Sequence, residues 1–142
     1  DSVTLRGSGA LRSVRPVRTA PYPGFPTDAQ PVLMAALLKS EGSTVFVENI
    51  FENRYRHVDE LSRMGADIRV AGRVAVVSGV KTLHGAAVKS TDLRGGAALV
   101  LAGLAAEGTT RVSGLEHIDR GYAAIERDLA ALGAHIYREE TT

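Results

Sequence analysis

The pattern of apolar and polar positions predicts strands that alternate with helices, in an order that occurs twice along the chain. In the first part, Leu33, Leu37 and Leu38 fall on one face of a helix, and β-branched residues recur in the segments around it. We expect a strand at 14–18, a helix at 28–39, a strand at 43–48, a helix at 57–64, a strand at 67–71 and a hairpin arm at 73–78.

The second part predicts the same order without the hairpin arm. We expect a strand at 86–89, a helix at 94–106, a strand at 109–113, a helix at 122–132 and a strand at 134–138. The apolar stretch 95–106 is interrupted at Gly103 and is too short to cross a bilayer, so it is typical of a buried helix. Alternating strands and helices of this length predict an α/β protein with parallel strand pairing.

Short sequence words confirm that one unit is repeated. Glu41-Gly42-Ser43-Thr44 returns as Glu107-Gly108-Thr109-Thr110, and Arg54 returns as Arg120, both at an offset of 66 residues. Thr27-Asp28 returns as Thr91-Asp92, and Met64-Gly65-Ala66 as Leu132-Gly133-Ala134. The chain is therefore interpreted as two pseudo-symmetric β-α-β-α-β repeats.

These repeats define one partial domain, with repeat A at about 1–80 and repeat B at about 81–142. A repeat that buries its face against neighbours commonly needs about three copies. The chain also begins without an initiator Met, so we expect it to belong to a longer protein. An uncovered apolar face favours self-association, most simply as a two-fold dimer.

Several residues predict where helices begin and end. Thr27 and Gln30 have the spacing of a capping box, with Thr27 as the N-cap. Gly42 and Gly108 follow the two long helices and are expected to supply left-handed residues that close them. Gly65 and Gly133 are expected to end the two shorter helices.

Composition excludes several classes of site. The chain has 142 residues, a net charge of +1 and no cysteine, which excludes a disulfide scaffold, a cysteine-ligated zinc site and a thiol nucleophile within it. Basic residues are mixed with acidic ones, which argues against a nucleic-acid partner. The four histidines lack metal-ligand spacing, and no membrane segment or secretory signal is present, so neither a metal nor a membrane partner is expected.

Carboxylates and arginines at repeated positions are the candidates for chemistry. Asp28 and Asp92 each open a long helix, where they either complement the helix dipole or present a base. Two prolines precede Asp28 and fix its approach, which favours a site. Arg54 and Arg120 recur at equivalent positions, and converging arginines suit a small polyanion.

Arg94 begins a helix together with Gly95 and Gly96. These glycines indicate either a phosphate at the helix start or close packing against a neighbouring element.

Six segments in register resemble the UDP-N-acetylglucosamine 1-carboxyvinyltransferase family of enolpyruvyl transferases: Thr19–Asp28, Phe51–Arg54, Arg63–Ala66, Thr91–Arg94, Leu101–Gly103 and His117–Tyr122. The resemblance covers only the C-terminal third of that family. It implies two domains, each an inside-out α/β barrel of three repeats, with the active site between them. This chain would supply two of the three repeats of one domain, and chain upstream of Asp1 would complete it.

The resemblance also implies roles, and no metal or organic cofactor. Asp28 corresponds to the aspartate that contacts the sugar 3-hydroxyl and acts as base, and Ile50 to an aliphatic contact of the UDP-sugar. Arg94 and Arg120 match arginines around phosphoenolpyruvate, while Arg54 and Asp92 line the same cleft. The implied reaction transfers enolpyruvate to UDP-N-acetylglucosamine, the first committed step of peptidoglycan synthesis in the bacterial cytoplasm.

The family's loop proton donor and its N-terminal Lys and Arg ligands lie outside this chain, so we expect the chain alone to be inactive. Gly95 and Gly96 replace the Ala and Ser that relatives often carry, which is expected to loosen that helix start. Three alternatives stay open: a transferase resembling 5-enolpyruvylshikimate-3-phosphate synthase, a non-enzymatic nucleotide-sugar binding module, and a structural repeat protein without a ligand.

Overall fold

The computed structural model describes residues 1–7 and 9–139. Its strands are β1 (Val17–Arg18), β2 (Ser43–Val47), β3 (Asp67–Ala71), β4 (Val74–Ser78), β5 (Ala87–Lys89) and β6 (Arg111–Ser113). Its helices are the 3-10 turn η1 (Thr27–Ala29), α1 (Gln30–Leu37), α2 (His57–Arg63), α3 (Leu93–Ala105), α4 (Leu115–Ile118) and α5 (Ile125–Ala131).

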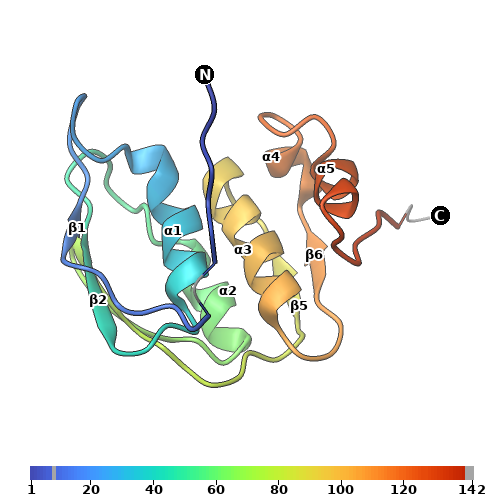
Figure 1. Cartoon of the computed structure of the whole chain (residues 1–142), viewed down its shortest axis with the longest axis horizontal. Helices are drawn as coiled ribbons and strands as arrows, with labels where there is room; N and C mark the ends of the chain where they lie inside the picture. Colours follow the sequence, from blue (N-terminus) through green and yellow to red (C-terminus); the bar gives the residue numbers. More distant parts are fainter. Residues whose placement is uncertain (8, 140–142) are drawn as a thin grey trace.

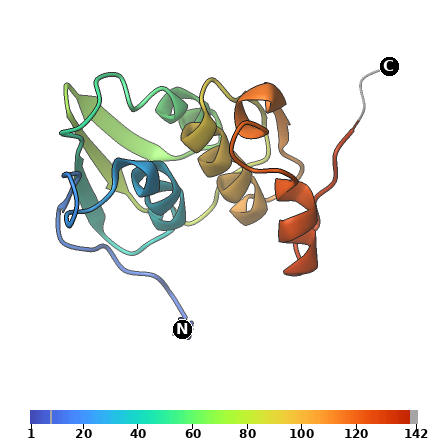
Figure 2. The same cartoon turned by 90° about the horizontal axis from the view of Figure 1, so that it is seen from above.

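The helices α1, α2 and α3 lie side by side between two separate sheets (Figures 1 and 2). Helix α3 packs against both α1 and α2, so it forms the centre of the helical layer. The sheets lie on the outside, with β1 and β2 on one side of the helices and β5 and β6 on the other (Figure 1). This layering places helices inside and strands outside.

The larger sheet has the strand order β1-β2-β4-β3, and the smaller one contains β5 and β6. Strands β1 and β2 are parallel, as are β5 and β6, which confirms the parallel pairing expected from alternating strands and helices. Strand β4 pairs antiparallel with both β2 and β3, so β3 and β4 form the hairpin expected around Gly72.

Equivalent contacts occur at equivalent places in the two repeats. A parallel bridge joins Arg12 to Glu41, and another joins His84 to Glu107. The main-chain N–H of Glu41 donates to Leu11 at 2.8 Å, and that of Glu107 donates to Leu83 at 2.8 Å. The repeated sequence words therefore correspond to repeated backbone geometry.

One apolar core joins the elements of both repeats. Residues from both repeats are buried in it: Met34 and Leu37 of α1, Leu38 directly after α1, Phe46 of β2, Leu61 of α2, Val77 of β4, Val88 of β5 and Leu99 of α3. Leu33 packs against this core from the expected face, whereas Leu104 near the end of α3 is exposed. The core thus holds the starts of α1 and α3 at the same end of the helical layer.

The strand expected at 134–138 is absent, and the last helix is shorter than expected. Residues 134–139 are irregular, and α5 spans Ile125–Ala131 rather than 122–132. In the first repeat, the corresponding strand β3 pairs with the hairpin arm β4 and with no other strand of the described residues. The second repeat has no such arm among the described residues, so this segment lacks the hydrogen-bonding partner that makes a strand.

The capping box expected at Thr27 and Gln30 is also wrong. The hydroxyl of Thr27 donates to the Glu48 carboxylate instead of capping a helix, and the Gln30 side chain is fully buried with no hydrogen-bond partner among residues 1–7 and 9–139. Gly65 and Gly133 have the left-handed conformation directly after their helices, as expected. Gly42 and Gly108 are left-handed too, but they lie in the turns beyond the helix ends.

The buried side chain of His57 begins α2 and packs beside the start of α3. It is 2% exposed, and its Cβ would lie 3.0 Å from a Cβ added at Gly95. Neither ring nitrogen has a hydrogen-bond partner in the described part of the chain. Burial lowers the pKa of His57 to about 4, so the imidazole is neutral near pH 7.

We predict that His57 makes folding sensitive to acid. Between pH 6.5 and about 4 the unfolded chain binds a proton on His57 that the folded chain does not, so stability is full above pH 6.5 and falls as the pH is lowered. The loss reaches about 3 kcal/mol. Urea unfolding at pH 7 and at about pH 4 measures it, and His57→Phe removes this part of the pH dependence.

The matched control is His84→Gln, because His84 is exposed. Its unfolding should keep the pH dependence of the unaltered protein. An identical pH dependence in the His57→Phe variant would contradict the prediction.

Candidate active site

Asp28 lies in η1, where a closed loop delivers it to the start of α1. Prolines 21, 23 and 26 stiffen this loop, and the Ala20 N–H donates to the Phe25 carbonyl at 3.0 Å, which closes it on itself. The Asp28 side chain is 57% exposed, so its carboxylate is accessible from outside the chain. The expected fixed approach to Asp28 is therefore present.

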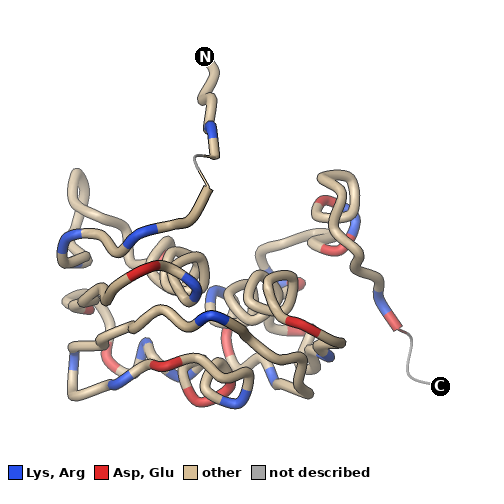
Figure 3. Tube along the Cα trace, turned by 60° about the horizontal axis from the view of Figure 1, so that its bottom comes forward, with Lys and Arg blue, Asp and Glu red and all other residues tan. Residues whose placement is uncertain are grey.

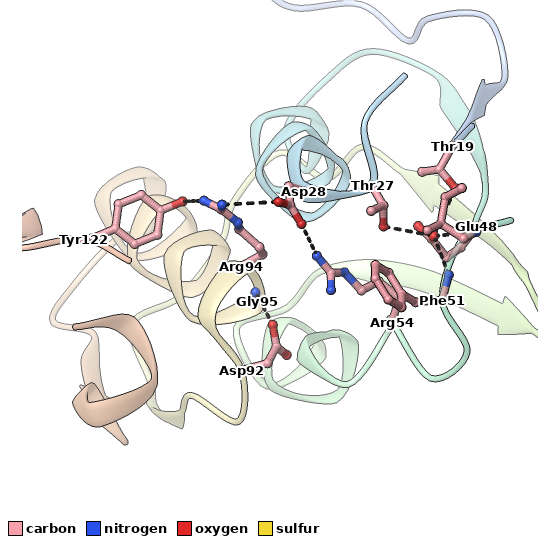
Figure 4. A network of polar contacts seen from close by, with 11 residues as sticks. Thr19, Thr27, Asp28, Glu48, Phe51, Arg54, Asp92, Arg94, Gly95 and Tyr122 are labelled. Carbon is pink, nitrogen blue, oxygen red and sulfur yellow. Dashed lines mark hydrogen bonds and ion pairs between the residues drawn. The ribbon is translucent and has the colours of Figure 1, made fainter. Parts of the chain in front are cut away.

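Arg54 reaches Asp28 from the loop between β2 and α2. Its Nη2 lies 2.8 Å from Asp28 Oδ1 (Figure 4). The guanidinium also stacks 5.1 Å from the centre of the Phe51 ring, while its buried Nε has no partner among the described residues. Stacking and ion pairing together fix the direction of this arginine.

Arg94 reaches the same carboxylate from the second repeat. Its Nη2 lies 3.3 Å from Asp28 Oδ2, and its Nη1 donates to the Tyr122 hydroxyl at 3.0 Å (Figure 4). The Tyr122 hydrogen bond and the Asp28 charge raise the pKa of Arg94. Tyr122 therefore anchors this arginine, with its ring 5.6 Å from the Arg94 guanidinium carbon.

Two guanidiniums thus share one carboxylate, which leaves an excess of positive charge at the cluster of Asp28, Arg54 and Arg94. Basic and acidic residues are otherwise interspersed along the chain (Figure 3). An anion with several oxygens can accept hydrogen bonds from both arginines at once. The cluster is therefore suited to bind a carboxylate or phosphate next to a carboxylate that can accept a proton.

Asp92 is brought to the same end of the helices but has a structural contact. It is the N-cap of α3, and its Oδ1 accepts a hydrogen bond from the Gly95 N–H at 2.7 Å. A Cβ at Gly96 would approach Ile118 Cγ1 to 2.6 Å, so these glycines permit close packing. The packing interpretation of Gly95 and Gly96 is supported, and the expected loosening of this helix start stays a prediction.

The two remaining candidates lie at the margins. Ile50 is partly exposed in the turn after β2, on the loop that also carries Arg54. Arg120 is exposed after α4 and is not among the residues that contact Asp28. The structure therefore joins Asp28, Arg54 and Arg94 directly, and Arg120 is not joined to them.

Glu48 was missed by the sequence analysis. This side chain is 1% exposed, and its Oε1 accepts hydrogen bonds from the hydroxyls of Thr19 and Thr27 at 3.0 Å each. The N–H groups of Ile50 and Phe51 donate to the same oxygen at 3.1 and 3.2 Å. The signal available in the sequence was a charged residue directly after the apolar run 45–47.

The described residues offer no other candidate of comparable chemistry. A groove of about 1080 Å³ runs between the β5–β6 sheet and the segment 133–139, and none of the candidate site residues lines it. Among residues 1–7 and 9–139, no group of three potential metal ligands occurs. In the same residues, no helix has both the length and the apolar composition needed to cross a membrane.

Comparison with known proteins identifies relatives of this fold and sequence. A family model for EPSP synthase (3-phosphoshikimate 1-carboxyvinyltransferase) matches residues 4–129. The UDP-N-acetylglucosamine 1-carboxyvinyltransferase of Desulfofundulus thermocisternus is 56% identical over 97% of this chain and 56% of its own length. UDP-N-acetylglucosamine 1-carboxyvinyltransferase 1 of Caldanaerobacter subterraneus is 56% identical over 87% of this chain and 30% of its own length.

The solved structure of the enolpyruvyl transferase NikO from Streptomyces tendae superposes with a TM-score of 0.84 at 32% identity, over 95% of this chain and 31% of that one. The chain therefore spans between about a third and just over half of the length of these relatives. The inside-out α/β arrangement expected from the sequence agrees with these neighbours. The chain belongs to the EPSP synthase (3-phosphoshikimate 1-carboxyvinyltransferase) family of enolpyruvyl transferases.

Proposed function

We propose that the protein containing this chain transfers enolpyruvate from phosphoenolpyruvate to the 3-hydroxyl of UDP-N-acetylglucosamine. The observation that carries the proposal is the Asp28 carboxylate held between Arg54 and Arg94. The Asp28 carboxylate accepts a proton, and the guanidiniums of Arg54 and Arg94 bind an anion. Phosphoenolpyruvate presents a carboxylate and a phosphate, which match two guanidinium forks.

The degree of similarity favours the UDP-sugar over shikimate 3-phosphate as the acceptor. Relatives named UDP-N-acetylglucosamine 1-carboxyvinyltransferase are 50–58% identical to this chain. The EPSP synthase structure from Acinetobacter baumannii is 25% identical with a TM-score of 0.63. We therefore favour the UDP-sugar acceptor over the alternatives that the sequence left open.

In the proposed mechanism, the sugar 3-oxygen bonds to C2 of phosphoenolpyruvate while Asp28 accepts the hydroxyl proton. C3 gains a proton from an acid outside this chain, which gives a tetrahedral ketal. Loss of the C3 proton and of the phosphate then forms the enolpyruvyl ether. Arginines that bind the carboxylate and phosphate stabilise the charge that develops in these steps.

The ion pairs of Asp28 suggest how binding and base activation are coupled. Both carboxylate oxygens of Asp28 are occupied by arginines in the structure described here. An incoming anion competes with Asp28 for the same donors. As Arg54 and Arg94 turn to the anion, an oxygen of Asp28 becomes available to the sugar hydroxyl.

The remaining sequence interpretations are part of the same proposal. We place Ile50 against the UDP-sugar, Arg120 as a residue that closes over phosphoenolpyruvate, and Asp92 at the edge of the cleft. The rest of a longer chain supplies the proton donor and completes the barrel. The product enters peptidoglycan synthesis in the cytoplasm.

Replacing Asp28 tests the base. In the full-length protein, Asp28→Asn should lower kcat at least ~100-fold, because a general base is lost while the side-chain shape is kept. Phosphate release that depends on both substrates measures turnover. Asp59→Asn is the control, since Asp59 is an exposed carboxylate in the first turn of α2, and it should leave kcat unchanged. Near-normal turnover of Asp28→Asn with reduced thermal stability would assign Asp28 a structural role.

Replacing the arginines tests the anion site. Arg94→Ala and Arg120→Ala should each weaken phosphoenolpyruvate binding by about 10- to 100-fold, because each removes a charge-assisted contact worth ~1.5–3 kcal/mol. UDP-N-acetylglucosamine binding should change much less, as measured by calorimetry with each substrate. Arg127→Ala on the exposed face of α5 is the control. Equal weakening of both ligands, or of neither, would contradict the assignment.

Isolating the 142-residue chain tests whether it associates with itself and whether it is inactive without the rest of the protein. The β5–β6 sheet has two strands, and residues 134–139 follow it without regular pairing, so unpaired strand edges favour association. We expect a dimer of the 15.0 kDa chain by light scattering and no turnover with the two substrates. A monodisperse monomer would contradict the self-association, and product formation would contradict the need for groups outside the chain.

A further inference from the structure

We propose that Glu48 is a positioning residue for the sugar substrate: it orders, through one buried oxygen, the two loops that carry Asp28 and Ile50. This inference rests on the proposed function and adds a residue to it. We do not place Glu48 in contact with the substrate. It orders the loops of Asp28 and Ile50, the residues that we place in contact with the sugar.

The first connection runs from Glu48 to the Asp28 loop. Thr27, the residue before Asp28, donates its hydroxyl to Glu48 Oε1 at 3.0 Å (Figure 4). Thr19, at the end of β1, donates to the same oxygen and also accepts the Asn49 N–H at 2.8 Å. Both ends of the proline-containing loop that delivers Asp28 are therefore fixed to the end of β2.

The second connection runs from Glu48 to the turn that follows it. The N–H groups of Ile50 and Phe51 point back to Oε1, so the chain wraps around its own carboxylate. Ile50 is the proposed contact of the UDP-sugar, and Phe51 is the surface on which Arg54 stacks. The orientation of this turn therefore depends on the charge and position of one side chain.

Neighbouring groups brace the same turn from the other side. Arg73 donates from Nη1 to the Glu48 carbonyl at 3.2 Å, and the Tyr55 hydroxyl donates to the Arg73 carbonyl at 2.9 Å. Burial, together with the negative charge of Glu48, raises the pKa of Tyr55 to about 12, so this hydroxyl remains a donor. The brace holds the strand end in place, while the Glu48 carboxylate reaches both loops.

A carboxylate suits this role better than a neutral side chain. Four donors converge on one oxygen, and hydrogen bonds to a charged acceptor are roughly twice as strong as bonds between neutral groups. A buried charge without such partners would be costly. Oε1 of Glu48 keeps all four donors only when both loops have their present conformation, which couples the two loops to each other, while Oε2 is buried without a partner among the described residues.

The test uses the full-length protein with Glu48→Gln, which keeps the shape and removes the charge, and with Thr27→Val, which removes one donor. We expect Glu48→Gln to raise the KM for UDP-N-acetylglucosamine ~10-fold, the equivalent of about 1.4 kcal/mol, with less change in the KM for phosphoenolpyruvate. Amide exchange at Ile50 and Phe51 should accelerate by a similar factor. Thr27→Val should lower kcat, and Thr27→Ser should restore it.

Glu52→Gln is the matched control, because Glu52 is on the same loop with its side chain 85% exposed. It should change neither KM nor amide exchange. Unaltered KM and exchange in Glu48→Gln, with only a lower Tm, would overturn the proposal. If Glu48→Gln does not fold, the kcat values of Thr27→Val and Thr27→Ser decide: equal values in the two variants would overturn the proposal. Absence of turnover in the unaltered protein would overturn the proposed function instead, and exchange at Ile50 and Phe51 would then decide whether Glu48 orders the turn.

Discussion

The close approach of α1 and α3 is the constraint on which the candidate site depends. Helix α3 presents small residues where it begins: Gly95, Gly96, Ala97 and Ala98 are all buried. Gly95 and Gly96 let the start of α3 approach His57 of α2 and Ile118 of α4 closely, and the packing of α3 on α1 brings the first turns of helices from two different repeats together. Arg94 can then reach Asp28 across a sequence distance of 66 residues. A bulky substitution at the start of α3 would move the arginine away from its carboxylate without touching either residue.

The alternation of strands and helices could be predicted from the sequence because apolar spacing reports which face of an element is buried. Residues 67–71 form a strand with the expected bounds, and the other elements of the first repeat differ at their ends. Contacts between elements could not be predicted in this way. Thr27 has the spacing of a cap, but a buried carboxylate 21 residues away is a better acceptor for its hydroxyl. The segment 134–138 has a strand-like pattern, but the part of the chain that the structure describes offers it no neighbouring strand.

The repeat explains the candidate site only in part. Asp28 and Asp92 occupy equivalent positions, yet Asp28 pairs with arginines while Asp92 caps its own helix. Arg54 and Arg120 are likewise equivalent, but only Arg54 contacts a carboxylate of the cluster. Repetition therefore located the candidates, and the asymmetric packing around them determined which ones meet. A sequence comparison between the two halves cannot separate these outcomes, because the differences lie in distant partners.

The protonation states around Arg54 have a consequence for the electric field at the site. His57 lies three residues after Arg54 and has a pKa of about 4, and the adjacent Tyr55 has a pKa of about 12. Neither group changes its charge between about pH 5 and pH 10. These two side chains therefore add no charge beside Arg54 over this range of pH. Any pH dependence of anion binding at this cluster must therefore come from groups other than His57 and Tyr55.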